Sequence, residues 1–227
     1  LTYIPTGSSN DLARANDYDD NMITNLCHLL YSKEYRYMDI GMVKYNKEET
    51  LGHNKRYFAV SAGMGYDASV CHEVNESKLK NFFNMIRLGK LVYLFIAVKQ
   101  LFKAQKNNIE LTIDDKQTMT LDKCYFASVL NHKYQGGGMM FCPEADACDG
   151  ILDICYASGI SKLGVLLTLP SCYKGNHVGK KGIGIERARK VHIVSENPLY
   201  VHTDGEVKTM ATDITVSILP SKLKFTV

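Results

Sequence analysis

Short apolar runs separated by glycine and polar residues recur along most of the chain, and such runs are typical of strands. The expected strands cover residues 37–45, 56–62, 108–113, 116–121, 123–130, 151–156, 191–195, 199–203, 207–210 and 213–219. The pair Asp114-Asp115 predicts a hairpin turn between two of them, and Gly63 with Gly65 predicts another turn. Most of the chain is therefore predicted to be rich in β-structure.

Apolar residues at helical spacing are confined to three segments. Residues 12–30 follow a strand-like run at 1–4 and a glycine turn, which together make half of a parallel βα unit. Residues 77–106 predict one helix, or two helices broken at Gly89. A short helix is predicted at residues 161–172.

The change in character near residue 35 predicts two parts. Residues 1–35 hold a single βα half-unit that nothing downstream repeats, so we interpret them as the remnant of an α/β domain. Residues 36–227 are expected to form a mostly antiparallel, β-sandwich-like domain with a few helices. The predicted fold class is therefore α+β.

Composition narrows the class of protein. Apolar residues make up 45% of the chain and charged residues 22%, which is ordinary for a globular protein and excludes global disorder. The seven cysteines include no Cys-x-x-Cys pair, so neither a disulfide framework nor a paired-cysteine zinc site is predicted. No apolar run approaches the roughly eighteen residues that a membrane span needs. We expect a cytoplasmic protein with reduced thiols.

The net charge of +3 is unevenly distributed. Residues 77–109 contain no acid but carry Lys78, Lys80, Arg87, Lys90, Lys99, Lys103 and Lys106. One interpretation is a helix that packs one face on the core and keeps its lysines in water. The other is a surface that docks on anionic bilayers, where each cation contributes roughly 1 kcal/mol. No recognition motif favours nucleic acid, so we expect no nucleic-acid partner.

Three glycine-containing segments could carry chemistry, although each also has a simple structural interpretation. Residues 5–14 could present backbone N–H groups to phosphate, or a polar residue among them could cap the following helix. Residues 136–150 combine three glycines with the turn pair Asp149-Gly150, which could hold a hard cation. Asp204 and Glu206 could be a general base and a metal partner, or residues of an ordinary hairpin. Taken singly, each segment favours the structural interpretation.

Taken together and in order, these segments resemble the diacylglycerol kinase catalytic family, which includes sphingosine and ceramide kinases and bacterial lipid kinases. The family's G-T-x-N-D-x-A-R segment is similar to residues 7–14, where Ser8 replaces the family's Thr and keeps a hydroxyl. A Gly-Gly-Gly stretch, a P-x-A…D-G segment and a late D-G-E follow in the family's order, at residues 136–138, 143–150 and 204–206. The resemblance covers essentially the whole chain.

The resemblance implies a lipid kinase that uses ATP and Mg²⁺, with residues 1–35 belonging to its nucleotide-binding domain. Ser8 and its loop, including Gly7 and Asn10, would contact the nucleotide. Asp11 would join a network of acidic residues around the catalytic magnesium. This first segment would therefore serve the phosphoryl donor.

The other segments would serve the acceptor and the fold. The resemblance implies that Asp204 or Glu206 is the general base that takes the proton from the lipid hydroxyl. It also implies that Asp149 ligates a second, structural magnesium, together with the carbonyls of Asp146 and Ile151. Phosphoryl transfer depends chiefly on metal, positioning and a base, so these roles are chemically consistent.

The implied substrate is a membrane lipid, with diacylglycerol first and sphingosine-type or phosphatidylglycerol-type acceptors as alternatives. The protein would associate peripherally with an anionic membrane surface, and a homodimer is compatible with the resemblance. The family's G-G-D-G-T segment, which lies against the ATP phosphates, is expected upstream of residue 1, so the polypeptide as given is expected to lack turnover. The rival hypothesis is a non-catalytic lipid-binding module, which the absence of that segment from the natural gene would favour.

Overall fold

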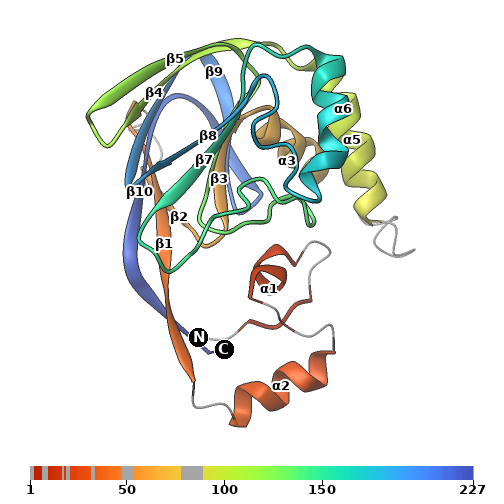
Figure 1. Cartoon of the computed structure of the whole chain (residues 1–227), viewed down its shortest axis with the longest axis vertical. Helices are drawn as coiled ribbons and strands as arrows, with labels where there is room; N and C mark the ends of the chain where they lie inside the picture. The colour runs from red at the N-terminus through yellow and green to blue at the C-terminus, as the bar shows by residue number, and fades with distance from the viewer. Residues whose placement is uncertain are drawn as a thin grey trace.

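The computed structural model describes residues 3–6, 10–16, 18, 21–31, 34–47, 54–77 and 89–226. Its helices are α1 (Asp11–Ala15), α2 (Met22–Tyr31), α3 (Tyr66–Glu76), α5 (Gly89–Lys103) and α6 (Lys162–Cys172). Its strands are β1 (Tyr35–Tyr45), β2 (Lys55–Phe58), β3 (Ser61–Gly65), β4 (Asn107–Ile113), β5 (Gln117–Cys124), β6 (Phe126–Leu130), β7 (Leu152–Ala157), β8 (Ile183–Ala188), β9 (Lys190–Thr203) and β10 (Glu206–Thr226). Figure 1 shows a curved β-structure with α3, α5 and α6 along one side and α1 and α2 at one end.

The described strands pair in antiparallel fashion, in the order β2-β1-β10-β9-β3-β6-β7-β8, and β4 pairs with β5 and β9. One edge of β9 has two neighbours, because residues 191–195 pair with β4 and residues 201–203 pair with β3. Val43 of β1 and Ile154 of β7 lie in one buried cluster although their strands are far apart in this order. The sheet therefore folds over itself, which confirms the predicted α+β, sandwich-like architecture.

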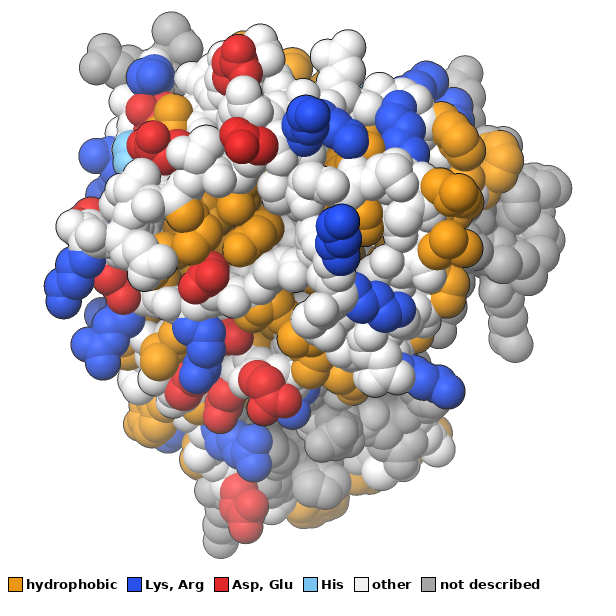
Figure 2. Space-filling view, turned by 45° about the horizontal axis from the view of Figure 1, so that its top comes forward, with side chains coloured by type: hydrophobic (Ala, Val, Ile, Leu, Met, Phe, Trp, Pro, Cys, Tyr) orange, Lys and Arg blue, Asp and Glu red, His pale blue; other side chains and the backbone are white. Residues whose placement is uncertain are grey.

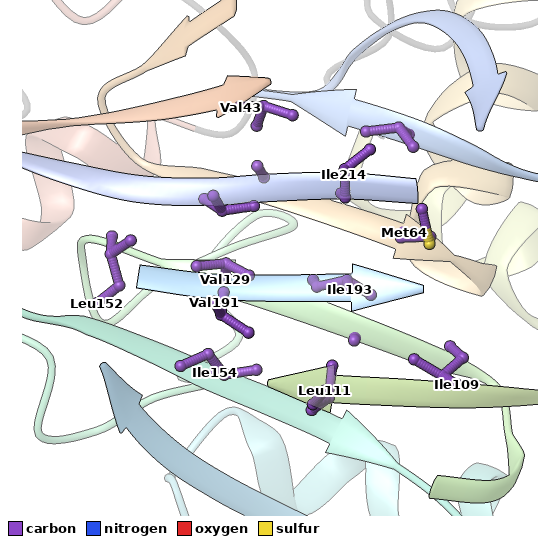
Figure 3. Packing of buried hydrophobic residues seen from close by; sticks show 14 of the residues in the cluster. Val43, Met64, Ile109, Leu111, Val129, Leu152, Ile154, Val191, Ile193 and Ile214 are labelled. Carbon is purple, nitrogen blue, oxygen red and sulfur yellow. The ribbon is translucent and has the colours of Figure 1, made fainter. Parts of the chain in front are cut away.

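Branched aliphatic side chains fill the space between the two halves of the sheet. Figure 3 shows Leu111 of β4, Val129 of β6, and Val191 and Ile193 of β9 gathered in this interior. Each such fully buried side chain contributes roughly 1.5–3 kcal/mol. A one-residue slip of any strand would turn these side chains outward, so the core also fixes the strand register. Through that register it fixes β3 and the end of β9, where the candidate site lies.

Helices α3, α5 and α6 cover the outer face of the sheet around β6. A second apolar cluster joins Leu101 of α5 and Val165 of α6 to Phe126 of β6. β6 is therefore buried along its whole length, with the sandwich core on one side and the helices on the other. This double burial explains why its sequence is a nearly continuous apolar run and does not alternate.

Several local predictions are confirmed. β4 and β5 form the hairpin around Asp114-Asp115, and both aspartates have the positive φ values that a tight hairpin turn requires. α6 begins directly after Ser161, whose hydroxyl accepts a hydrogen bond from the backbone N–H of Gly164 at 3.0 Å. The predicted helix at residues 77–106 is confirmed for α5, whose first residue is Gly89, whereas residues 78–88 lie outside the described residues.

The turn predicted at Gly63 and Gly65 is wrong for Gly63, which lies within β3, whereas Gly65 ends β3 with a φ of 111° and leads directly into α3. A Cβ atom on Gly63 would lie 1.9 Å from Oδ2 of Asp67 and 2.7 Å from Nε2 of His202. Glycine is therefore needed at this position for close packing against buried polar side chains. The chain also turns between β2 and β3, within the single strand predicted at residues 56–62.

Some strand lengths also differ from the prediction. The strands predicted at 191–195 and 199–203 are one strand, β9, and those predicted at 207–210 and 213–219 are one strand, β10. The pairing of β9 with β10 shifts register twice, and the shift between Ala211 and Asp213 lies where a break between two strands was predicted. α3 and β8 were not predicted, and residues 3 and 4, the described part of the strand predicted at residues 1–4, are not in a strand. Within the described residues, no helix has the length and apolarity to cross a membrane.

Candidate active site

A cavity of about 870 Å³ lies between the sheet, the helices α1, α3, α5 and α6, and the glycine loop at residues 136–137. α5 and α6 contribute only apolar residues to its lining, among them Val98 and Leu169. The acidic residues of the lining come from other elements: Asp11 from α1, Asp67 from α3 and Asp204 from the turn between β9 and β10. A largely apolar cavity of this size with a few converging polar groups is typical of a small-molecule site.

The first predicted motif and the glycine motif meet at this cavity. Oδ2 of Asp11, the first residue of α1, accepts a hydrogen bond of 2.9 Å from the backbone N–H of Gly137. The three glycines have φ values of 70°, 87° and 104°, which side-chain-bearing residues rarely adopt. The loop therefore requires glycine, and its geometry brings a backbone amide to the Asp11 carboxylate.

Asn10 precedes α1 in a left-handed conformation, with φ of 50°, and its side chain does not cap the helix. The capping interpretation is therefore wrong for Asn10, whose Oδ1 accepts a hydrogen bond of 3.4 Å from the Tyr3 hydroxyl. Gly7 and Ser8 lie outside the described residues. Nucleotide contacts by these three residues stay a prediction.

The Asp204-Gly205 pair forms the two-residue turn between β9 and β10, so the hairpin interpretation is confirmed. The carboxylate of Asp204 also accepts three backbone hydrogen bonds from the β2–β3 turn, from Ala59 at 2.8 Å, Val60 at 2.9 Å and Ser61 at 3.0 Å. These bonds orient the carboxylate at the cavity wall. Glu206 is exposed on β10 and is not part of the cavity lining.

A buried acid–imidazole pair lies beneath this turn. Nε2 of His202 is 3.1 Å from Oδ2 of Asp67, and both side chains also line the cavity. The backbone N–H of Gly205 donates to Nδ1 of His202 at 3.3 Å, so the ring proton is on Nε2 and points at Asp67. The chain of contacts from Asp67 through His202 to Gly205 therefore connects the interior to the D-G-E turn.

The electrostatics of Asp67 reflect this environment. Burial favours the neutral carboxyl, but hydrogen bonds from His202, Ser128 and the backbone of Ala68 outweigh burial and lower the pKa of Asp67 below its ordinary value. Neither Asp67 nor His202 was among the predicted site residues. Asp67 lies two residues after Gly65 and His202 two residues before Asp204, but neither position indicates that the two side chains pair.

The predicted structural cation site lies apart from the cavity. Oδ1 of Asp149 accepts a hydrogen bond of 2.9 Å from the backbone of Ile151, and Oδ2 forms an ion pair with Arg187. Oδ1 of Asp146 accepts from the backbone of Cys148 at 3.0 Å. The described residues include no cluster of three or more His, Cys, Asp or Glu arranged to hold a metal ion. A cation at this turn stays a prediction, and it would compete with the Arg187 guanidinium for Asp149.

Comparison with known proteins identifies the class to which this architecture belongs. Residues 59–227 match the family described as YegS C-terminal NAD kinase beta sandwich-like domain. The match covers more than half of the chain, and the chain therefore belongs to this family.

Individual relatives agree with this assignment. A diacylglycerol kinase of Mycobacterium tuberculosis (strain ATCC 25618 / H37Rv) is 26% identical over 206 residues, which are 91% of this chain and 62% of the relative. A diacylglycerol kinase of Bacillus subtilis (strain 168) is 24% identical over the same shares of the two chains. The crystal structure of a diacylglycerol kinase from Bacillus anthracis str. Sterne superposes with a TM-score of 0.70 at 20% identity, covering 100% of this chain and 68% of that one. The chain thus has the fold of that protein and spans 62% of the length of the first two relatives.

Proposed function

We propose that this chain supplies the lipid-binding part of an ATP-dependent lipid kinase, which transfers the γ-phosphoryl group of ATP to a hydroxyl of a membrane lipid. Diacylglycerol is the first candidate, because the curated relatives described above carry that name. The observation that supports the proposal best is the cavity itself. Asp11 and Asp204, far apart in sequence and both picked out by their motifs, line one mostly apolar cavity.

The wall contributed by α5 and α6 suits the acyl chains of a lipid, because burial of hydrocarbon is favourable at roughly 25 cal/mol per Å². A lipid hydroxyl would then lie against the acidic residues, which come from α1, α3 and the β9–β10 turn. Asp204 is our candidate for the general base, because it lines the cavity and three backbone amides fix its direction. Glu206, on the same turn but outside the lining, is our candidate metal partner.

Mg²⁺ and ATP complete the proposal. The carboxylate of Asp11 is the kind of hard oxygen donor that Mg²⁺ prefers, and Asp11 lines the same cavity as Asp204. When bound, the ion would neutralise charge on the transferring phosphate. Gly7, Ser8 and Asn10 remain the candidate nucleotide contacts, and Asp11 would position the glycine loop beside them through its bond to Gly137.

The test uses the natural protein that contains this chain, with labelled ATP and diacylglycerol in mixed detergent micelles. Asp204→Asn should lower kcat by about 10²–10⁴-fold, as expected for loss of a general base. Glu206→Gln is measured in parallel, and the exposed Asp122→Asn is the matched control. Thermal unfolding of each variant separates a catalytic loss from a folding defect, because Asp204 also holds the β2–β3 turn.

A near-normal rate for Asp204→Asn would show that the D-G-E segment is only a hairpin turn. Lipid binding without any transfer in the wild-type protein would favour the rival hypothesis of a non-catalytic lipid-binding module. If Glu206→Gln lowers kcat strongly and Asp204→Asn leaves kcat unchanged, then Glu206 and not Asp204 is the general base. Each result therefore distinguishes between stated alternatives.

A further inference from the structure

Two acid-free segments of the chain meet on one side of the molecule. Besides residues 77–109, the segment from Ile154 to Ile185 contains no Asp or Glu, and it carries Lys162, Lys174, Lys180 and Lys181. These segments contain α5 and α6, which pack together, and Nζ of Lys162 donates to the backbone carbonyl of Phe102 at 2.5 Å. The fold thus brings two separate cationic stretches into one neighbourhood.

The same two helices expose bulky apolar side chains. Phe95 and Phe102 of α5 are each 64% exposed, and Leu163 and Leu167 of α6 are 64% and 70% exposed. The spacings of seven and four residues place each pair on one face of its helix. Figure 2 shows a band of hydrophobic side chains, with Lys and Arg side chains beside it, on the side where Figure 1 places α5 and α6.

We call this surface the α5–α6 face. It consists of Phe95, Phe102, Leu163 and Leu167 together with the described lysines of the two acid-free segments. It is continuous with the cavity, because the adjacent residues Val98 of α5 and Leu166 of α6 line the cavity wall. An apolar surface that borders an apolar cavity and has lysines on both of its helices differs from an ordinary solvated helix face. Its chemistry complements a surface that is apolar inside and negatively charged outside.

We propose that the α5–α6 face docks on an anionic lipid bilayer, with its aromatic and leucine side chains inserted among the acyl chains and its lysines at the headgroups. The passage of a lipid from the bilayer between α5 and α6 into the cavity rests on the proposed function. The docking of this face on the bilayer does not. Lys103 and Lys174 are exposed and carry the electrostatic part. Lys99 contributes less, because it already pairs with Glu73 at 2.6 Å.

The test is co-sedimentation of the protein with neutral phosphatidylcholine vesicles and with vesicles that contain roughly 30% phosphatidylglycerol, which carry a negative surface potential. The wild-type protein should bind the anionic vesicles, and binding should weaken as salt rises from about 0.1 M toward 1 M. The double variant Lys103→Gln, Lys174→Gln should bind about 25-fold more weakly, at about fivefold for each lysine. The matched control is Lys116→Gln, in the turn between β4 and β5, combined with Lys222→Gln, on β10; both lysines are exposed, and this double variant should bind normally.

The apolar part is tested by Phe102→Ser with Leu167→Ser, which should also lose vesicle binding, because both side chains would leave the bilayer. Exposed side chains contribute little to folding, and Tyr57→Ser on β2 is the matched control. Equal binding to neutral and anionic vesicles, or binding to neither, would overturn the proposal. Sedimentation equilibrium provides a further check. A concentration-dependent dimer that the Phe102→Ser, Leu167→Ser variant abolishes would also overturn the proposal, because a second copy of the chain would then cover this face.

Failure of docking and failure of the proposed function give different results. If both hold, the lysine and the Phe102→Ser, Leu167→Ser variants keep normal phosphate transfer to detergent-dispersed lipid and lose vesicle binding. Asp204→Asn shows the reverse pattern. If the protein binds anionic vesicles in the predicted way but transfers no phosphate, the docking proposal stands and the proposed kinase function is refuted.

Discussion

Asp67→Asn keeps the shape of a buried side chain while it exchanges one carboxylate oxygen for an NH₂ group. Oδ1 of Asp67 accepts from the backbone of Ala68 at 2.8 Å, and an amide oxygen can replace it there. The NH₂ group would then occupy the place of Oδ2, which accepts from the Ser128 hydroxyl and from Nε2 of His202. The serine hydroxyl can rotate and accept, whereas the imidazole cannot release its proton to Nδ1, because Gly205 N–H already donates to that atom.

The variant therefore leaves a buried N–H group facing another donor. An unsatisfied buried donor costs about 1–3 kcal/mol, and a lost hydrogen bond to a charged group adds about 1.5–3 kcal/mol. We expect Asp67→Asn to lower the free energy of unfolding by about 3–5 kcal/mol near pH 7. Urea unfolding followed by circular dichroism measures the difference, with the exposed Asp122→Asn as a control that should change stability by less than about 0.5 kcal/mol.

The pH dependence gives a second readout. Because the pKa of Asp67 is lower in the folded than in the unfolded protein, its ionised form stabilises the fold above the ordinary carboxyl pKa of 3.8, and this contribution is lost as the pH falls through the lowered value. The variant lacks this contribution at every pH. Its stability deficit should therefore shrink as the pH falls below about 3.8. A deficit that is absent at neutral pH, or that stays constant with pH, would refute the proposed role of the carboxylate.

Three further changes test other parts of the structure. Gly41→Ala would place a Cβ 2.0 Å from the ring of buried Phe58, so overpacking should lower stability by about 1–3 kcal/mol in urea unfolding. Ser161→Ala removes the cap bond to Gly164 and should cost about 1 kcal/mol, measured in the same way. Burial raises the pKa of Asp153 to about 6, so this carboxyl stabilises the fold below pH 3.8 and loses that effect as the pH rises through about 6. Asp153→Asn should flatten this slope, and an unchanged slope across pH 4 to 7 would assign it to other groups.

The elements that the sequence predicted well are those whose cause is local. The hairpin at Asp114-Asp115 follows from residues that tolerate positive φ, and α6 follows from its own cap residue. The continuous length of β9 depends instead on its partners, since its two ends pair with β4 and β3. Gly63 shows the same limit. Glycine permits both a turn and the close approach of a neighbouring side chain, and the sequence alone does not distinguish the two.

The candidate site was only partly predictable for a related reason. Asp11 and Asp204 were found through their motifs, but their common cavity depends on long-range contacts such as the bond from Gly137 to Asp11. Asp67 and His202 are buried polar residues whose pairing is set by the tertiary structure. Nothing local in the sequence distinguishes such a pair from two unrelated polar residues.

The central claim is that the cavity between the sheet and α3, α5 and α6 holds a lipid with its hydroxyl at the acidic residues. The most direct measurement is photo-crosslinking with a diacylglycerol that carries a diazirine at the end of one acyl chain, followed by peptide mapping with mass spectrometry. The account predicts adducts on the apolar lining, at Val98, Leu166 or Leu169, which unlabelled diacylglycerol suppresses. Adducts confined to residues outside this cavity, or labelling that unlabelled lipid does not suppress, would contradict it.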